Sequence, residues 1–210
     1  YKERGIDILN GERVEVASAA QHFQGGGKID EYGRTAVQGL WAIGETAGGH
    51  HGANRPGGNA LMDCQVFGKI AGTDAARFAL GKADACPEAE LIRMAENSVI
   101  PCGNLDKEYA LTVRGRISRI MDRFGGVIRT QRGLSQAIAE LDALRPELDA
   151  GYTADALAVS IENRSIWLCA LMILSAAKLR FESRGPHLMF TDESAAELAA
   201  RDDIFWRKYI

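Results

Sequence analysis

A glycine-rich loop and the apolar run that follows it hold the side chains best suited to bind an anion. The loop brings together His50, His51, Asn54, Arg55 and Asn59. Glycine lets a backbone approach a ligand closely, and the free N–H groups at a helix start attract negative charge. Before the loop comes a short apolar strand, Gly39-Leu-Trp-Ala-Ile-Gly-Glu45. Strand, glycine-rich loop and helix in this order predict a ligand-binding corner of an α/β fold.

Arg55 is the first candidate for a functional residue. A planar guanidinium forms two parallel hydrogen bonds with a carboxylate, which fixes the orientation of the ligand as well as its charge. Pairing with a structural acid is the alternative role. Glu45 ends the strand, where its carboxylate is placed to accept hydrogen bonds from the hydroxyls of a cofactor. A surface carboxylate is the alternative there.

Three histidines lie near this corner. His22 precedes the turn Gln24-Gly-Gly-Gly27, and on spacing alone a single histidine is more often structural than functional. His50 and His51 adjoin the loop. A metal site needs further ligands close by, and the sequence shows none, so no metal is expected.

Length, charge and cysteine usage limit the function classes. The 210 residues allow one or two domains that each bury a core. A net charge of −3 gives no reason to expect nucleic acid or an anionic membrane surface as a partner. The four cysteines are widely spaced without a C-x-x-C pair, which argues against a cysteine-based zinc or iron–sulfur site and suits a reducing compartment.

The longest run without a charge is too short for a membrane span. Ser165–Ala177 falls below the roughly 20 residues that a spanning helix needs. Charged residues flank it, so we expect a buried helix and no direct membrane insertion. The chain begins at Tyr1 without a visible signal peptide, so we expect it to be the interior of a longer protein.

Hydrophobic periodicity divides the chain into two pieces. Strands are expected at 12–20, 28–35 and 39–45, a helix at 59–80, and a linker at 81–87. Beyond the linker no strand is expected, and the helices expected there are 88–98, 106–124, 130–144 and 153–183. Asp106 and Thr130 stand where helix starts should be. We therefore expect an α/β piece over 1–82, with too few strands to close a sheet alone, and an all-helical piece over 86–210.

Apolar stripes specify how the helical piece packs. One stripe holds Leu134, Ile138, Leu141 and Leu144. A second, on the long last helix, holds Leu157, Ile161, Leu168, Leu171 and Leu174, of which the last three are expected inside. Helices with such stripes make a bundle.

Residues 22–73 resemble the second half of the FAD-binding domain of the fumarate reductase/succinate dehydrogenase flavoprotein family, which includes L-aspartate oxidase. The matching pieces are His22-Phe-Gln-Gly-Gly-Gly27, Gly39-Leu-Trp-Ala-Ile-Gly-Glu45, His51-Gly-Ala-Asn-Arg55 and Gly57-Gly-Asn-Ala-Leu61. The second piece resembles the family's helical C-terminal domain through Arg129, Glu162-Asn-Arg164, Glu182-Ser-Arg-Gly-Pro-His187 and Arg201-Asp-Asp-x-x-Trp206. The implied fold class is α+β: an incomplete C-terminal half of an FAD-binding α/β domain, followed by an all-α bundle.

The resemblance implies a role for each site residue. Arg55 and His22 are implied to bind the substrate and act in catalysis, and His51 to orient the loop or touch the substrate. The segment from His22 to Asp30 is one residue shorter than the family pattern. The residues implied for FAD are Glu45, Asn59, Ala60 and Leu61, the last three at the helix start that would face the flavin. Ser183-Arg-Gly-Pro-His187 is implied to pack against the flavin domain or a partner subunit.

The implied function is hydride transfer between FAD and a small dicarboxylate, interconverting fumarate and succinate. L-aspartate oxidase is the alternative enzyme, and a non-catalytic helical module that docks a partner subunit is the alternative of another class. An iron–sulfur electron-transfer subunit is the implied partner, and the implied location is the cytoplasm, with membrane association through partner subunits. No G-x-G-x-x-G follows a strand, so we expect this chain alone to bind FAD weakly and to be inactive.

Overall fold

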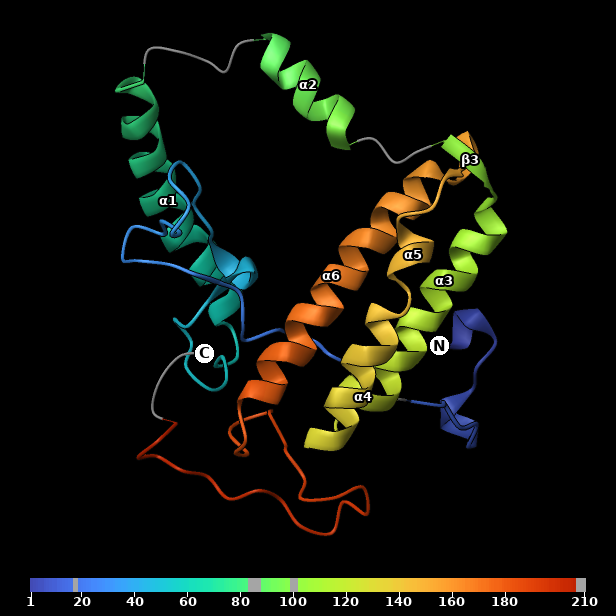
Figure 1. Cartoon of the computed structure of the whole chain (residues 1–210). Coiled ribbons are helices and arrows are strands. Elements are labelled where there is room, and N and C mark those ends of the chain that lie inside the picture. Colours follow the sequence, from blue (N-terminus) through green and yellow to red (C-terminus); the bar gives the residue numbers. More distant parts are fainter. Residues whose placement is uncertain (17–18, 83–87, 99–101, 207–210) are drawn as a thin grey trace.

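Two groups of elements, joined by helix α2, make up the fold (Figure 1). The computed structural model describes residues 1–16, 19–82, 88–98 and 102–206. The first group contains β1 (Gly27–Lys28), the 3₁₀ turn η3 (Gly44–Thr46), β2 (Ala47–Gly48) and α1 (Asn59–Leu80). α2 (Glu88–Ser98) follows. The second group contains β3 (Cys102–Leu105), α3 (Lys107–Ile120), the π-helical turn η4 (Met121–Gly125), α4 (Gln131–Asp142), α5 (Arg145–Leu148), the 3₁₀ turn η5 (Ala154–Ala156) and α6 (Leu157–Leu179).

The second group is a helical bundle in which α6 packs against α3 and α4. Its largest fully buried apolar side chains are Val113, Ile117, Leu134, Leu141, Leu144, Leu148, Leu174 and Met189. The buried Asn163 ties α6 to α3, because its side-chain nitrogen donates to the Ala110 carbonyl (2.7 Å) and its oxygen accepts from Arg114 Nε (3.0 Å). Apolar stripes thus form the core, and the buried amide of Asn163 between them is paired through both its nitrogen and its oxygen.

Two of the expected helix starts are confirmed by their caps. The Asp106 carboxylate accepts the backbone N–H of Tyr109 at 2.8 Å, at the start of α3. The Thr130 hydroxyl accepts the N–H of Gly133 at 3.0 Å, at the start of α4. Each cap satisfies an N–H group that has no partner within its own helix.

The bundle also corrects two expectations. Leu174 is fully buried and Leu171 half-buried, but Leu168 is 52% exposed, so the stripe on α6 is narrower than the leucine pattern predicted. The expectation that no strand follows the linker was wrong, because β3 pairs with Tyr152 through bridges at Cys102 and Leu105. Most of the expected linker lies outside the described residues.

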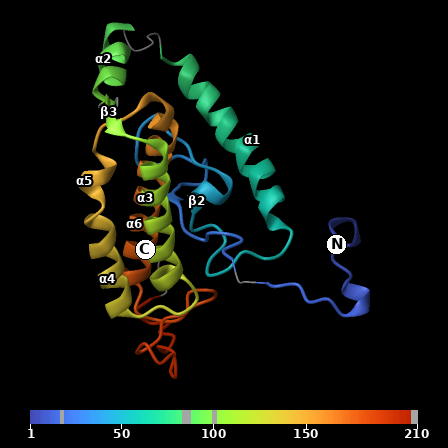
Figure 2. The same cartoon turned by 90° about the vertical axis from the view of Figure 1, so that its right-hand side faces the viewer.

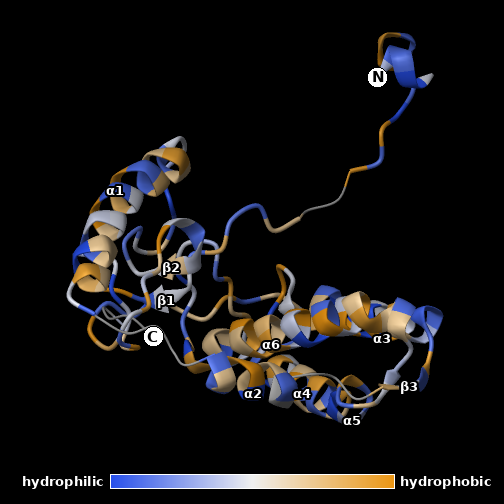
Figure 3. Cartoon of the chain, turned by 90° about the horizontal axis from the view of Figure 1, so that it is seen from above, coloured by the Kyte–Doolittle hydropathy of each residue, from blue (hydrophilic) through white to orange (hydrophobic). Residues whose placement is uncertain are grey.

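The first group has less strand than the pattern predicted. β1 and β2 form a two-stranded parallel sheet with Gly27 opposite Ala47 and Lys28 opposite Gly48. Of the expected strand at 39–45, a single bridge between Trp41 and Arg34 remains, and the expected strand at 12–20 has none over its described residues. Figures 2 and 3 show this sheet between α1 and the bundle, and the N-terminal segment extending away from both.

Polar contacts hold α1 against the segment between β1 and β2. Asp74 is buried and accepts hydrogen bonds from Arg34 (2.6 and 2.5 Å) and from Trp41 Nε1 (2.9 Å), while Phe78 contacts the Trp41 ring. Its apolar side chains differ in burial: Ala71 is buried and Phe78 is half-buried, whereas Leu61 is 79% and Met62 56% exposed. Periodicity therefore placed the helix correctly over 59–80, and only some of its apolar residues are buried.

A buried carboxylate fixes the segment after α6. Glu182 is 2% exposed, pairs with Arg180 (2.8 Å) and with Arg184, and accepts the backbone N–H of Asp202 (2.7 Å). Burial raises the pKa of Glu182, but hydrogen bonds from Arg184, the Asp202 N–H and Arg180 outweigh it, so the pKa falls to about 2. Nearby, His187 Nε2 lies 3.1 Å from the Arg180 carbonyl oxygen and its Nδ1 3.1 Å from Arg129.

One described stretch, Ala154–Leu179, is long and apolar enough to cross a membrane by length and composition alone. It comprises η5 and α6, and one face of α6 packs on α3 and α4. Core helices of bundles pass the same test, so this property is weak evidence for a span.

Shortening the side chain of Leu174 to alanine should destabilise the bundle far more than shortening that of Leu168. Leu174→Ala removes a fully buried side chain and should lower the free energy of unfolding by about 2–5 kcal/mol. Leu168→Ala removes an exposed side chain of the same size and should change little. Urea unfolding monitored by circular dichroism measures both, and equal losses would contradict this packing.

Acidic pH should lower the stability of the fold because Glu182 becomes protonated. The pKa of Glu182 lies near 2 in the folded chain and at an ordinary 4.5 when unfolded, so its contribution is complete above pH 4.5 and is lost as the pH falls toward 2. Glu182→Gln should cost roughly 3–5 kcal/mol at neutral pH and flatten the pH dependence in that window. Thermal unfolding from pH 7 to pH 2, with the exposed Glu197→Gln as the control, measures this. An unchanged profile in Glu182→Gln would remove Glu182 as the cause.

Candidate functional site

The predicted corner forms around the loop that joins β2 to α1. His22 comes from the segment before β1, Glu45 from η3, and His50, His51 and Arg55 from the loop. The His22 and His51 ring centroids lie 6.0 Å apart, in an edge-on arrangement. Residues far apart in the sequence thus reach one place because parallel β1 and β2 bring their flanking segments together.

His22 and Glu45 pair with each other. His22 Nδ1 lies 3.2 Å from the Glu45 carboxylate, which also accepts the backbone N–H of Phe23 at 2.9 Å. The His22 side chain is 8% exposed and that of Glu45 is 48% exposed. The Glu45 carboxylate therefore orients the imidazole, and part of the carboxylate remains accessible to a ligand.

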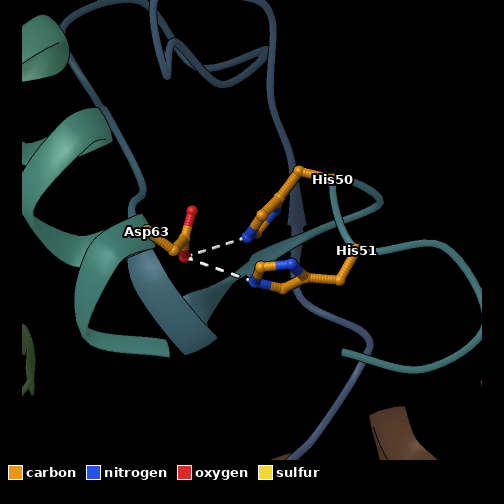
Figure 4. A group of neighbouring side chains, drawn as sticks. All are labelled: His50, His51 and Asp63. Atoms are coloured by element: carbon orange, nitrogen blue, oxygen red, sulfur yellow. Dashed lines mark hydrogen bonds and ion pairs between the residues drawn. The ribbon is translucent and has the colours of Figure 1, made fainter. Parts of the chain in front are cut away.

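Asp63, from the second turn of α1, joins the two loop histidines (Figure 4). Its Oδ2 lies 3.0 Å from His50 Nε2 and 3.6 Å from His51 Nε2. The Asp63 side chain is 5% exposed and both imidazoles are 13% exposed. Sequence reasoning missed Asp63 as a ligand-type residue near the histidines. The i to i+4 spacing from Asn59, the first residue of α1, would have placed it on the face above the helix start.

His51 sits in a setting that disfavours its protonated form. Burial lowers the pKa of His51, and His50, His22 and Arg55 lower it further, against the opposing charge of Asp63. The imidazole is therefore neutral at pH 7, with one nitrogen free to accept a hydrogen bond or to bind a ligand.

Arg55 has no acidic partner among the residues that the structure describes. Its Nη1 donates to the Pro56 carbonyl at 3.1 Å, and its Nε is buried without a hydrogen-bond partner. Over the described residues, no carboxylate lies within ion-pair distance of its guanidinium. The alternative that a structural acid neutralises Arg55 therefore finds no support in the part of the chain that the structure describes.

The start of α1 is open to a ligand. Gly58 caps the helix with φ 85° and no side-chain hydrogen bond. The Asn59 N–H donates to the Pro56 carbonyl at 3.3 Å, but no side-chain cap satisfies the other N–H groups of the first turn. A Cβ added at Gly57 or Gly58 would meet no atom within 4 Å. Asn59 and Ala60 are half-buried and Leu61 is exposed at this start.

The helical group touches the loop directly. Gly185, in the turn Arg184–His187, has φ 58°, and a Cβ there would lie 2.5 Å from the Ala53 carbonyl oxygen. Ala53 stands two residues before Arg55. The turn Ser183-Arg-Gly-Pro-His187, which the resemblance implied to pack against the flavin domain or a partner subunit, lies against the loop that carries Arg55.

Comparison with known families identifies both groups. The family model for an FAD-binding domain matches residues 4–61, and the model for the fumarate reductase flavoprotein C-terminus matches residues 114–210. The chain belongs to the fumarate reductase/succinate dehydrogenase flavoprotein family. FAD is the cofactor that this match indicates, and the fold class is the expected incomplete FAD-binding domain followed by a helical domain.

Individual relatives agree. The chain is 35% identical over 193 residues to one subunit of the fumarate reductase (CoM/CoB) of Methanothermobacter marburgensis, covering 89% of this chain and 35% of that protein. It is 34% identical to L-aspartate oxidase 1 of Ralstonia nicotianae, over 88% of this chain and 34% of that protein. The structure of a quinol–fumarate reductase with menaquinol superimposes with a TM-score of 0.73 at 27% identity, covering 88% and 33%. Sdh1 of Mycobacterium smegmatis gives 0.71 at 28% identity, covering 80% and 30%. The chain spans about a third of the length of these relatives.

The geometry of this corner fits an anionic cofactor such as a flavin dinucleotide. The start of α1 has no side-chain cap, and among the described residues Arg55 Nε is buried without a partner, so both can donate hydrogen bonds to a ligand. The free space at Gly57 and Gly58 lets a ligand approach them. FAD, the cofactor that the family match indicates, carries acceptors of that kind.

The close approach of the two strands should make Gly26 sensitive to a side chain. A Cβ at Gly26 would clash with the backbone of Thr46 and lie 2.7 Å from Ala47, so Gly26→Ala should cost roughly 1–3 kcal/mol and separate β1 from β2. Gly57→Ala, which meets open space, is the matched control. Thermal unfolding and proteolysis of the segment before Asn59 measure both. Equal behaviour of the two variants would contradict the paired strands.

Proposed function

We propose that the protein containing this chain is an FAD-dependent oxidoreductase that interconverts fumarate and succinate, or a similar dicarboxylate pair, by hydride transfer. The observation that carries the proposal is Arg55. It is half-buried, has no acidic partner in the described part of the chain, and lies in the loop before a helix start without a side-chain cap. The names of the relatives, fumarate reductase and L-aspartate oxidase, support a dicarboxylate as the substrate.

Arg55 would hold one substrate carboxylate. Its planar fork forms two parallel charge-assisted hydrogen bonds, and these fix the direction of the substrate's carbon chain. Holding the substrate in a reactive orientation lowers the barrier and accounts for a large part of the rate enhancement of an enzyme. The Pro56 carbonyl, which accepts from Nη1, holds the guanidinium in place.

His22 would bind the substrate from the other side. Its Nδ1 is engaged by Glu45, which fixes the ring and leaves Nε2 on the opposite edge. In this arrangement one ring nitrogen of His22 contacts Glu45 and the other is directed to a substrate carboxylate. His51, whose ring lies 6.0 Å from that of His22, would contact the substrate or hold the loop.

The residues proposed to hold the cofactor are Glu45 and the first turn of α1. FAD, when bound, supplies the hydride donor or acceptor. The half-exposed Glu45 carboxylate would accept from its hydroxyl groups. The N–H groups of Ala60 and Leu61 would offer positive charge at the helix start, and Asn59, whose own N–H donates to the Pro56 carbonyl, would line the same approach. Gly57 and Gly58 keep that approach free of side chains.

The proposed electron partner is an iron–sulfur subunit. We infer a cytoplasmic protein that reaches the membrane, where it does so, through partner subunits. The similarity to a quinol–fumarate reductase and to Sdh1 supports this. The proposed domain division is 1–82 for the FAD-binding part and 86–210 for the helical domain.

L-aspartate oxidase is the second candidate, because six of the similar relatives carry that name at 31–34% identity. Aspartate is also a four-carbon dicarboxylate, so Arg55 would serve both reactions. Turnover with succinate or fumarate against turnover with aspartate separates the two. A module that only docks a partner is disfavoured, since it needs no unpaired arginine in a ligand loop.

Replacing Arg55 by lysine in the full-length protein should lower turnover by orders of magnitude. Arg55→Lys keeps the charge but loses the planar fork, whereas Glu45 and the helix start retain the flavin. Steady-state fumarate reduction or succinate oxidation, beside flavin content, measures both effects. Arg132→Lys is the matched control, because Arg132 is 87% exposed in the helical group.

Two results would count against this role. Wild-type rates and Michaelis constant in Arg55→Lys would remove Arg55 from the active site. Flavin loss in proportion to activity would assign it to the cofactor or to folding.

A further inference from the structure

A hydrogen bond between two amide side chains joins the segment of His22 to the loop of Arg55. Gln24 Nε2 donates to Asn54 Oδ1 at 3.1 Å. Gln24 stands two residues after His22, and Asn54 immediately precedes Arg55. A ring contact between His22 and His51, with centroids 6.0 Å apart, lies across the same two segments. The hydrogen bond adds a direction and a fixed length to that contact.

The paired strands do not by themselves fix the spacing of His22 and Arg55. β1 and β2 hold the two segments together where Gly27 lies opposite Ala47. His22 comes before this sheet and Arg55 after it, and glycines on both sides leave the backbone many conformations. The Glu45 carboxylate, 3.2 Å from His22 Nδ1, holds one of the two side chains. A contact outside the sheet is needed to hold both at one distance.

The bond to Asn54 accounts for the position of Gln24. Gln24 is half-buried, and its Oε1 is buried without a hydrogen-bond partner among the described residues. A buried oxygen without a donor is unfavourable, so the bond from Nε2 is the contact that favours this placement of the side chain. Both Oε1 and an ionised carboxylate only accept, so this oxygen does not bind a substrate carboxylate. Gln24 therefore acts on the substrate through Asn54.

We propose that Gln24 is a positioning residue: through Asn54 it sets the distance between His22 and Arg55, and with it the length of the dicarboxylate that this corner accepts. The inference rests on the proposed function, in which these two side chains bind the substrate. A ligand held from two sides binds well only if its carboxylates match that distance, and a misplacement of about 1 Å costs on the order of a hundredfold in rate. Without the bond, each segment relaxes independently and the corner accepts several lengths.

The test compares dicarboxylates of two lengths in the full-length protein with FAD bound. Malonate and glutarate carry the same charge and differ in the length of the carbon chain. Titration with each, followed by the change in flavin absorbance, gives two dissociation constants for the wild type, Gln24→Ala, Asn54→Ala and the double variant. Gln136→Ala is the matched control, because Gln136 donates to Glu140 at 2.8 Å on α4, in the helical group. Flavin content and circular dichroism confirm that each variant is folded.

We expect the two wild-type dissociation constants to differ by about tenfold or more, since a site of fixed length discriminates between chain lengths. Gln24→Ala and Asn54→Ala should each reduce this ratio to about threefold or less, and the double variant should reduce it no further, because both changes remove the same contact. Gln136→Ala should keep the wild-type ratio.

A wild-type ratio in Gln24→Ala would overturn the inference. Equal weakening of both ligands, which a purely structural role of Gln24 would cause, and equal affinities of the wild type for both lengths would overturn it as well. Should Gln24→Ala fail to retain flavin, the ratio in Asn54→Ala decides. No binding of either ligand by the flavin-loaded wild type would contradict the proposed function itself, and this inference with it.

Discussion

Two buried aspartates of α1 hold the ligand corner together. Asp63 and Asp74 are eleven residues apart, three helical turns, so they lie on one face of the helix. Asp74 binds Arg34 and Trp41 from the segment between β1 and β2, and Asp63 meets His50 and His51 from the loop. Because a buried carboxylate needs a cationic or N–H partner, these two contacts fix where the loop enters α1 and how Arg55 is presented.

The arginines of the chain show what distinguishes a ligand-binding guanidinium. Arg34 is held by Asp74, and Arg184 by Glu182 and Asp203. Arg129 donates to the Gly125 and Gly126 carbonyls and contacts His187. Arg55 has one carbonyl acceptor and a buried unpaired Nε. These three arginines stabilise the fold, whereas Arg55 retains hydrogen-bonding capacity for a substrate. The turn at Gly185 supports its loop from the helical side.

Helices were predictable from this sequence, and their packing was predictable only in part. Caps at Asp106 and Thr130 and the 3.6-residue spacing are local signals, so helix positions followed directly. The strands around 12–45 were overestimated, since strand formation depends on pairing partners that a local pattern does not contain. α1 packs by its aspartates rather than its leucines for a related reason: which face is buried depends on what surrounds it. Asp63 was missed because a carboxylate twelve residues from His51 reveals its proximity only once α1 is folded beside the loop.

The central claim is that Arg55 binds a substrate carboxylate beside the flavin. The most direct measurement is a crystal structure of the full-length protein with FAD and malonate, an unreactive dicarboxylate. The account predicts a malonate carboxylate on both guanidinium nitrogens of Arg55, with His22 Nε2 in contact with the same ligand. Malonate bound elsewhere, with Arg55 paired to an acid of the protein, would contradict it.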